Sequence, residues 1–343
     1  MAARVRPDRI GELIEGGDLD ELVRHVDHLC FAEDWDGLVE LRDRSRKAFE
    51  RGRQLWPVAS LAEYRLALEA PAPWAAAVVV PGAGRFALGP LPEVAAQDHR
   101  WADLAPHLPR TPEATFVAHE RVVRGEDLSG DERVDRTALE LPLRVEPWEP
   151  EYPVAVYRPD EAQFPERPSA TAVAAAAATV ELPAPAQEVD DPEACTALVE
   201  LAGAWVTESN GHARAIAVAG DAVAALATLG ASGAGPPAHL GLAPVPVEDA
   251  LAAMAWTAAS GGAHGRRRGM AAGRFGAWWA ATALSIGLDR WPPAPDALGE
   301  ALTALRWFRW QPASGASAGW SLRLAVEDAG AGRAWVVEAV DTV

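Results

Sequence analysis

The 343-residue sequence has a single lysine, Lys47, and only two cysteines, Cys30 and Cys195. Two cysteines are too few for a disulfide framework, and on their own they cannot complete a zinc site. The run of uncharged, mostly apolar residues from Phe275 to Leu288 has 14 residues, whereas a membrane-spanning helix needs roughly 18 or more. The N-terminus also lacks the apolar segment of a secretory signal. We therefore expect a cytoplasmic protein that does not associate with membranes.

Recognisable catalytic motifs are missing as well. The sequence holds no G-x-S-x-G, H-E-x-x-H, C-x-x-C or Walker pattern. Ser260 and His264 stand four residues apart in one glycine-rich stretch, but no acidic residue that would orient the imidazole is identifiable. His25 and His28 have a spacing that can ligate a metal from one helix, yet nothing marks a third ligand, so we interpret them as solvated. We assign no catalytic residue, metal or cofactor, and we favour a protein without enzymatic activity.

Positive charge is scarce, since the formal net charge is -18 at pH 7. Such acidity argues against non-specific binding to nucleic acid or to an anionic membrane surface. The charge is uneven. Residues 146–200 contain twelve acidic residues and two arginines, whereas residues 250–343 contain seven acidic residues and nine arginines. The arginines of the C-terminal part can face the acidic middle of the same chain or an anionic ligand. Nucleic-acid binding through this part is the least favoured interpretation.

Glycine, arginine and tryptophan are instead concentrated between Ser260 and Leu288. The pattern predicts a glycine-rich loop from Ser260 to Gly265 that leads into a helix of about twenty residues. Gly265, Gly269 and Gly273 recur every four residues, so they would share one face of that helix. A face without bulky side chains allows a second backbone to approach closely.

The arginines of this stretch predict an anion-binding pocket. Cations at the start of a helix oppose the macrodipole and favour a negative partner, and N–H groups of a glycine loop would bind the same phosphate or carboxylate. One helix face would combine Arg267, Arg274 and Trp278, whose indole offers a stacking surface. The candidate ligand-binding residues are Ser260, Gly261, Gly262, His264, Gly265, Arg266, Arg267, Arg268, Arg274 and Trp278. The alternative is that the arginines pair with acidic residues of the chain itself and that the tryptophans belong to the core.

Residues 1–140 predict a helical domain. The phrases DLDELVRHVD and DWDGLVELRD begin at Asp18 and Asp34, sixteen residues apart, and each aspartate can cap a helix. Further helical patterns follow from Trp56 to about Glu126, separated by short breaks. The series resembles an α-solenoid of the armadillo or HEAT type, or a helical bundle.

The remainder of the chain predicts a linker and a second domain. Residues 141–192 are rich in proline and acidic residues, which is typical of a linker or an extended strap. Residues 193–343 alternate between helical and strand-like patterns and predict an α+β domain.

Three strands near the C-terminus are expected to form a small antiparallel meander, over residues 306–312, 319–328 and 333–342. In the middle strand, every second residue from Trp320 to Val326 is apolar. The residues that alternate with them, from Ser321 to Glu327, are mostly polar. Side chains of a strand alternate between the two faces of a sheet. We therefore expect one face of the meander to be buried and the other to be exposed to solvent.

Two phrases of the sequence resemble uncharacterised proteins of GC-rich bacteria. They are WPVASLAEYRLALEAPAPWAAAVV, which begins at Trp56, and SGGAHGRRRGMAAGRFGAWWAA, which begins at Ser260. The resemblance covers most of the chain and implies no activity. The near-exclusive use of arginine in place of lysine agrees with a GC-rich coding sequence.

We therefore expect a non-enzymatic interaction or regulatory protein. Its helical half would present a groove to a protein partner or to a second copy of the chain, and its α+β half would carry the arginine-lined pocket. The alternative is an enzyme, or a protein that binds a nucleotide or another phosphate ligand, whose site is the glycine-rich loop and arginine-bearing helix at 260–279. Nine of the fourteen tryptophans lie between residues 205 and 335, and we assign them chiefly to the core.

Overall fold

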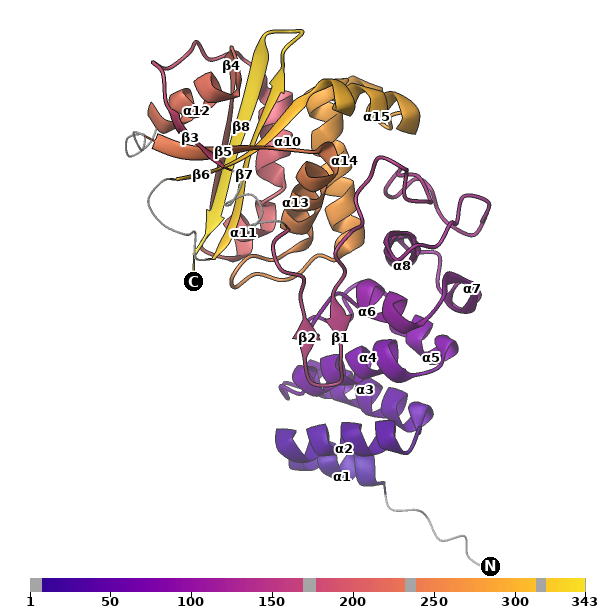
Figure 1. Cartoon of the computed structure of the whole chain (residues 1–343). Coiled ribbons are helices and arrows are strands. Elements are labelled where there is room, and N and C mark those ends of the chain that lie inside the picture. The colour runs from indigo at the N-terminus through magenta and orange to yellow at the C-terminus, as the bar shows by residue number, and fades with distance from the viewer. Residues whose placement is uncertain (1–7, 169–176, 232–238, 313–318, 343) are drawn as a thin grey trace, which may run out of the picture. The chain divides into compact units, whose positions relative to one another are not determined.

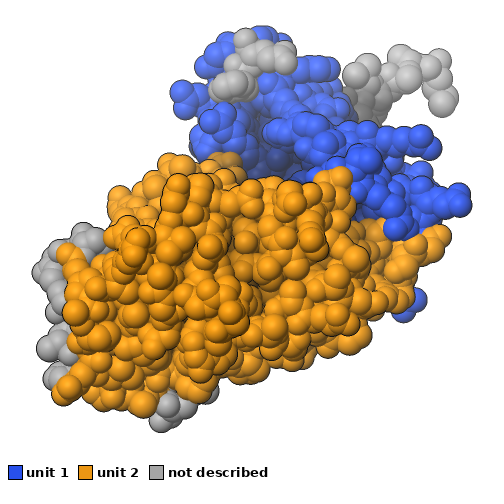
Figure 2. All heavy atoms as spheres, turned by 90° about the horizontal axis from the view of Figure 1, so that it is seen from above, with its two compact units in different colours: residues 1–121, 131–138, 155–163 blue, residues 122–130, 139–154, 164–343 orange. Residues whose placement is uncertain are grey.

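The computed structural model describes residues 8–168, 177–231, 239–312 and 319–342 (Figure 1). The chain divides into two compact units (Figure 2). Unit 1 comprises the residues up to 121 together with 131–138 and 155–163, and unit 2 comprises 122–130, 139–154 and the residues from 164 onward. The segment 141–192 contributes residues to both units. The predicted combination of a helical N-terminal part with an α+β C-terminal part is confirmed.

Unit 1 is built mainly from helices. These are α1 (Arg9–Gly16), α2 (Leu19–Phe31), α3 (Trp35–Glu50), α4 (Trp56–Glu69), α5 (Ala72–Ala77), α6 (Leu91–Asp98), α7 (Trp101–Leu104) and α8 (Pro112–Val123), whose C-terminal end belongs to unit 2. Both expected caps are confirmed. Oδ1 of Asp18 accepts hydrogen bonds from the backbone N–H groups of Asp20 and Glu21 at 2.9 and 3.1 Å, and Oδ1 of Asp34 accepts one from Gly37 at 3.0 Å. Each cap satisfies N–H groups that the first helical turn leaves unpaired.

Helix α4 is the central helix of unit 1. It packs against α2, α3, α5 and α6, and most of its residues are buried. A helix buried on most sides must pair its polar groups, and Arg65 forms ion pairs with Asp27 and Glu69, each at 2.6 Å. The hydroxyl of Tyr64 donates to the carbonyl of Arg158 at 2.5 Å. Arg158 lies in the connection between two short paired strands, β1 (Val156–Tyr157) and β2 (Ala162–Gln163).

Unit 2 is organised around a six-stranded antiparallel sheet with the strand order β3-β5-β6-β7-β8-β4. The strands are β3 (Ala178–Glu181), β4 (His212–Ala219), β5 (His239–Val245), β6 (Arg306–Pro312), β7 (Trp320–Asp328) and β8 (Arg333–Asp341). The predicted meander is confirmed as β6, β7 and β8. It is the middle of a larger sheet, because β5 pairs with β6 and β4 pairs with β8.

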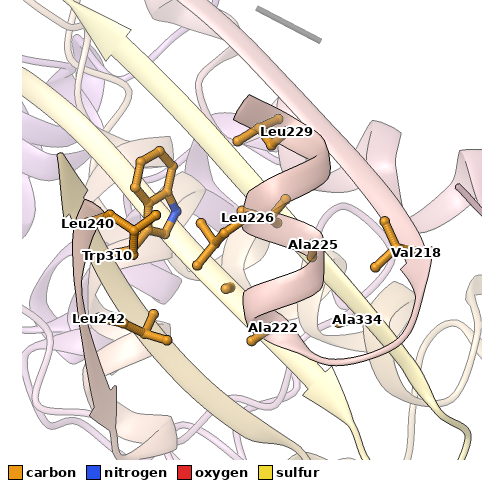
Figure 3. Close-up of a cluster of buried hydrophobic side chains, with 11 residues drawn as sticks. Val218, Ala222, Ala225, Leu226, Leu229, Leu240, Leu242, Trp310 and Ala334 are labelled. Carbon is orange, nitrogen blue, oxygen red and sulfur yellow. The ribbon is translucent and has the colours of Figure 1, made fainter. Parts of the chain in front are cut away.

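One face of this sheet is covered by α12 (Ala222–Ala231) (Figure 1). Figure 3 shows Leu226 of α12 directed toward Trp310 and Leu240 of the sheet, in a buried apolar cluster. The expectation that one face of β7 is exposed to solvent is therefore wrong. Glu327 accepts a hydrogen bond from the backbone N–H of Ala222 at the start of α12, and Ser321 and Glu327 are only 3% and 5% exposed.

The opposite face is covered by a layer of helices (Figure 1). Helices α10 (Pro192–Glu200), α11 (Gly203–Glu208) and α13 (Val247–Ala259) contact the sheet, and α14 (Met270–Ser285) packs on α10 and α13. A short 3-10 helix (Leu288–Arg290) and α15 (Pro295–Ala304) follow α14. A Cβ added to Gly273 would lie 2.3 Å from the carbonyl oxygen of Ala255. The expected close approach of a second backbone is thus found at Gly273.

Helix α14 begins later than predicted. The sequence pattern places its start near Gly265, whereas the helix starts at Met270, after Gly269 with a φ of +92°. Glycine adopts a positive φ readily, whereas a residue inside a right-handed helix has a negative φ, so the helix cannot include Gly269. Arg266, Arg267 and Arg268 therefore lie in the loop before the helix, and Gly265 and Gly269 do not share a helix face with Gly273. Within the part of the chain that the structure describes, no helix is both long and apolar enough to cross a membrane.

Candidate ligand-binding site

The glycine-rich loop, Ser260–Gly269, folds back on itself. A Cβ added to Gly261 would lie 2.3 Å from backbone atoms of Gly265, so no side chain fits at that position. Gly262 has a φ of +73°, in the left-handed region that favours glycine. The glycines are thus required for the tight course of the loop.

Two carboxylates of unit 2 accept hydrogen bonds from this loop. Oδ2 of Asp341, at the end of β8, accepts from the backbone N–H of Ala263 at 2.6 Å. Glu208 accepts from the backbone N–H of Arg266 at 3.2 Å and from the guanidinium of Arg268 at 2.5 Å. These hydrogen-bond donors of the loop therefore have acidic partners within unit 2. For Arg268, this agrees with the alternative prediction that the arginines pair with acidic residues of the chain itself.

Ser260 and His264 also take part in holding the loop. The Ser260 hydroxyl is buried. Its oxygen accepts from the indole Nε1–H of Trp205 at 2.8 Å, and the hydroxyl donates to the carbonyl of Thr257 at 3.1 Å. The backbone N–H of His264 donates to Oγ of Ser209 at 3.1 Å, and the residue is exposed. The Ser260 hydroxyl is thus engaged in the packing of the loop.

Arg274 and Trp278 belong to a separate, buried cluster centred on Glu149. The carboxylate of Glu149 accepts two hydrogen bonds from the guanidinium of Arg274, at 2.6 and 2.7 Å, and one from Nε1 of Trp278 at 2.9 Å. The hydroxyl of Tyr152 donates to it at 2.5 Å, and the backbone N–H of Glu146 donates at 2.9 Å. The side chains of Glu149 and Arg274 are both 0% exposed. This cluster is buried, and its residues do not line the cavity described below.

The pKa of Glu149 is lowered in this cluster. Burial alone would raise it, but the hydrogen bonds and the positive charge of Arg274 outweigh that effect. A carboxylate with a lowered pKa stabilises the folded protein above its ordinary pKa, and this contribution is lost as the pH falls through the folded value.

We therefore expect the free energy of unfolding to decrease as the pH is lowered below about 4, in part through protonation of Glu149. The Glu149→Gln variant should be less stable at pH 7 but should lose less stability over the acidic range, because its side chain does not titrate. Urea denaturation of both proteins between pH 7 and pH 3 measures the difference. Parallel curves for the two proteins would contradict the assignment.

A cavity of about 190 Å³ lies beside the glycine-rich loop, and we name it the aromatic pocket. It is lined by Phe164, Pro165, Trp256, Ser260, Gly261, Gly262, Ala263, Gly265, Arg267 and Trp320. The rings of Trp256 and Trp320 stack, with centroids 5.1 Å apart and an interplanar angle of 17°. The guanidinium carbon of Arg267 lies 5.5 Å from the ring centroid of Phe164.

The structure brings half of the predicted site residues to this pocket. Ser260, Gly261, Gly262, Gly265 and Arg267 line it. The other predicted residues, His264, Arg266, Arg268, Arg274 and Trp278, are not among its lining residues. The shared helix face expected for Arg267 and Arg274 does not form, because Arg267 precedes the helix.

Five lining residues are not among the predicted ones: Ala263 of the loop itself, and four residues outside the loop that could not be identified from the sequence. Phe164 and Pro165 lie in the proline-rich segment, Trp256 lies on α13 and Trp320 begins β7. The density of tryptophan in the second half of the chain was the available signal. It does not tell which rings meet, because their meeting depends on how α13 packs on the sheet.

The pocket offers aromatic surface and one positive charge. Among its described lining residues none has a carboxyl, imidazole, thiol or amine group. General acid–base catalysis needs a titratable group within hydrogen-bond reach of the substrate. The lining therefore consists mainly of aromatic and backbone surface, with the hydroxyl of Ser260 and the guanidinium of Arg267 as its polar side-chain groups.

The fold and the pocket define a protein with a helical unit and an α+β unit, the latter with a small aromatic cavity beside a glycine-rich loop. The chain belongs to a family of unknown function, DUF6183, whose family model matches residues 20–343. The resemblance to uncharacterised proteins is confirmed at this level, and the bacterial source stays a prediction. No curated protein and no solved structure matches the chain.

Proposed function

We propose that this chain is a non-enzymatic binding protein that recognises a protein partner through the aromatic pocket. The observation that carries the proposal is the stacked pair of Trp256 and Trp320 at a cavity that also has Arg267 on its wall. Small-molecule sites usually have volumes of about 300–1,000 Å³, so a cavity of about 190 Å³ is small for a cofactor. Its size suits a single apolar side chain, which is how an anchor residue of a partner binds.

Arg267 gives the pocket a preference for negative charge. Arg267 is a half-buried residue of the pocket wall, and its guanidinium lies over the ring of Phe164. A carboxylate next to the bound apolar side chain, such as the C-terminus of a partner, is a suitable ligand for a guanidinium. The nucleotide- or phosphate-binding alternative receives less support, because the N–H groups of Ala263 and Arg266 already donate to carboxylates of unit 2.

A pair of small probes tests the proposal. We expect N-acetyl-L-phenylalanine, which has a free carboxylate, to bind about fivefold more tightly than N-acetyl-L-phenylalaninamide, because a partly exposed charge pair contributes up to about 1 kcal/mol. Titrations followed by NMR would detect binding of both probes at the indole N–H of Trp256 and at the backbone N–H groups of Gly261 and Gly262.

Two variants control for the role of charge. Arg267→Gln should abolish the preference for the carboxylate while retaining affinity for the amide. Arg266→Gln, which removes the neighbouring charge outside the pocket lining, should keep the preference. If neither probe shifts the Trp256 or glycine signals at millimolar concentration, the pocket does not bind apolar side chains and the proposal is wrong.

A further inference from the structure

A second cavity, of about 450 Å³, lies within unit 1, and we name it the unit 1 cavity. Two segments of the chain line it, one between residues 101 and 115 and the other between residues 132 and 135. Sites for small molecules usually have volumes of about 300–1,000 Å³. The unit 1 cavity therefore has room for a free small molecule, whereas the aromatic pocket does not.

Two hydrogen bonds hold the two lining segments together. Nε1–H of Trp101 donates to Oδ2 of Asp131 at 2.9 Å, and the hydroxyl of Thr115 donates to the carbonyl of Asp135 at 3.3 Å. Trp101 and Thr115 are themselves buried, at 3% and 1% exposed. The segment that ends at Asp135 is thus anchored at both ends to the opposite wall of the cavity.

Part of the lining is apolar. Trp101, Leu108 and Val134 belong to it, and Trp101 and Val134 are largely removed from solvent. An apolar group that enters the cavity would replace water against these side chains, which is favourable. The cavity therefore offers a place for a hydrophobic side chain of a ligand.

Charged side chains of both signs also line the cavity. Arg133 is neutralised by Asp131, with which it forms an ion pair. Arg110 and Glu132 are different, because neither has an ion-pair partner among the residues that the structure describes, and they do not pair with each other. Asp135, on the same segment as Glu132, adds a second carboxylate. The cavity thus presents an unpaired cation on one wall and carboxylates on the other.

A hydroxyl without a partner lies next to Arg110 in the chain. Oγ1 of Thr111 is buried, and no described residue forms a hydrogen bond with it. Thr111 directly precedes α8, where a threonine hydroxyl ordinarily accepts from an N–H group of the first turn. Buried polar groups without partners are uncommon in folded proteins. A carboxylate bound to Arg110 would give this hydroxyl an acceptor.

We propose that the unit 1 cavity binds a free α-amino acid with an apolar side chain. The carboxylate of the amino acid pairs with Arg110 and accepts from Thr111, its ammonium group pairs with Glu132, and its side chain packs against Trp101. A guanidinium is well suited to a carboxylate, which it can bind through two parallel hydrogen bonds. An amino acid carries a carboxylate, an ammonium group and a side chain on one carbon atom, and the lining has a counterpart for each.

Three related ligands test the proposal on the full chain. L-leucine has both charges, L-leucinamide lacks the carboxylate, and N-acetyl-L-leucine lacks the ammonium group. L-leucine should bind at least about fivefold more tightly than either of the others, because each partly exposed charge pair makes a modest contribution. An NMR titration measures the affinities at the indole N–H of Trp101 and at the backbone N–H groups of Ala114 and Val134, while the indole N–H of Trp256 reports on the aromatic pocket.

Two variants assign the charges to their subsites. Arg110→Gln should abolish the preference for L-leucine over L-leucinamide and keep the preference over N-acetyl-L-leucine. Glu132→Gln should have the reverse effect. Arg24→Gln and Glu21→Gln make the same changes in charge at exposed positions on α2, outside the cavity lining, and they should leave both preferences unchanged.

Thr111→Val tests the hydroxyl. Valine has nearly the same shape as threonine, and the substitution removes a polar group that has no partner in the fold, so the melting temperature should not fall. The affinity for L-leucine should fall about fivefold, because a hydrogen bond to the carboxylate is lost. A lowered melting temperature with unchanged affinity would show that the hydroxyl serves the fold, and would overturn its assignment to the site.

The remaining outcomes are equally decisive. The proposal is wrong if L-leucine at millimolar concentration leaves the Trp101 signal unchanged, if all three ligands bind equally, or if the shifts are confined to Trp256. L-leucinamide that binds as tightly as L-leucine would identify the N-terminal residue of a peptide as the ligand, and would overturn the assignment to a free amino acid. Because the aromatic pocket has its own signals and probes, failure here leaves the proposed function standing.

Discussion

The Arg274→Ala variant is expected to lower the free energy of unfolding of unit 2 by about 3–5 kcal/mol, because removing one partner of a buried ion pair leaves the other charge uncompensated. Glu149 has no exposed side-chain surface and receives two of its hydrogen bonds from Arg274. The same guanidinium donates to the carbonyls of Pro142 and Arg144 at 2.8 and 2.7 Å. Its loss therefore leaves a buried carboxylate and two backbone carbonyls without their donors.

Urea denaturation followed by tryptophan fluorescence measures this loss, and Arg268→Ala is the matched control. Arg268 also pairs with a glutamate, Glu208, but their side chains are 45% and 34% exposed. Exposed pairs contribute about 0–1 kcal/mol, so the control variant should unfold close to the wild type. An Arg274→Ala variant as stable as Arg268→Ala would show that water or a rearranged side chain compensates Glu149.

The pairing of Arg274 illustrates what the sequence can and cannot predict about the site. The acidic excess of residues 146–200 and the arginine excess of residues 250–343 indicate that charges from the two regions can pair. They do not identify Glu149, which is 125 residues from Arg274 along the chain. The same limitation applies to the hydrogen bond between Trp256 and Pro165, which are 91 residues apart along the chain. Contacts at such separations depend on the packing of whole elements.

Much of the secondary structure follows from local signals. The carboxylate caps are predicted from single residues, Asp18 and Asp34, and the strands of the meander follow from composition and turn residues. Two features were missed for physical reasons. The start of α14 depends on the backbone conformation of Gly269. The burial of Glu327 depends on which face of the sheet α12 packs against. Neither is encoded in a local pattern.

The second large effect is expected at Gly273, in the contact between α13 and α14. Gly273→Ala should destabilise unit 2 by about 2–3 kcal/mol, because the added methyl group overpacks a closed contact. The new Cβ would lie 2.3 Å from the carbonyl oxygen of Ala255 and 2.8 Å from Cβ of Ala259. The carbonyl belongs to the backbone of α13, so relief requires the helices to separate. The gain of about 1 kcal/mol in helix propensity does not offset this.

Gly203→Ala is the control, since no atom lies within 4 Å of its added Cβ, and its stability should change by less than about 1 kcal/mol. Gly273→Ala also links the helix contact to the pocket. Ala255 immediately precedes Trp256, whose indole N–H donates to Pro165, so a displaced α13 should also weaken binding of N-acetyl-L-phenylalanine. Thermal denaturation and the NMR titration measure the two effects. A Gly273→Ala variant with wild-type stability and affinity would show that α13 and α14 separate without strain, and that their close approach does not position Trp256.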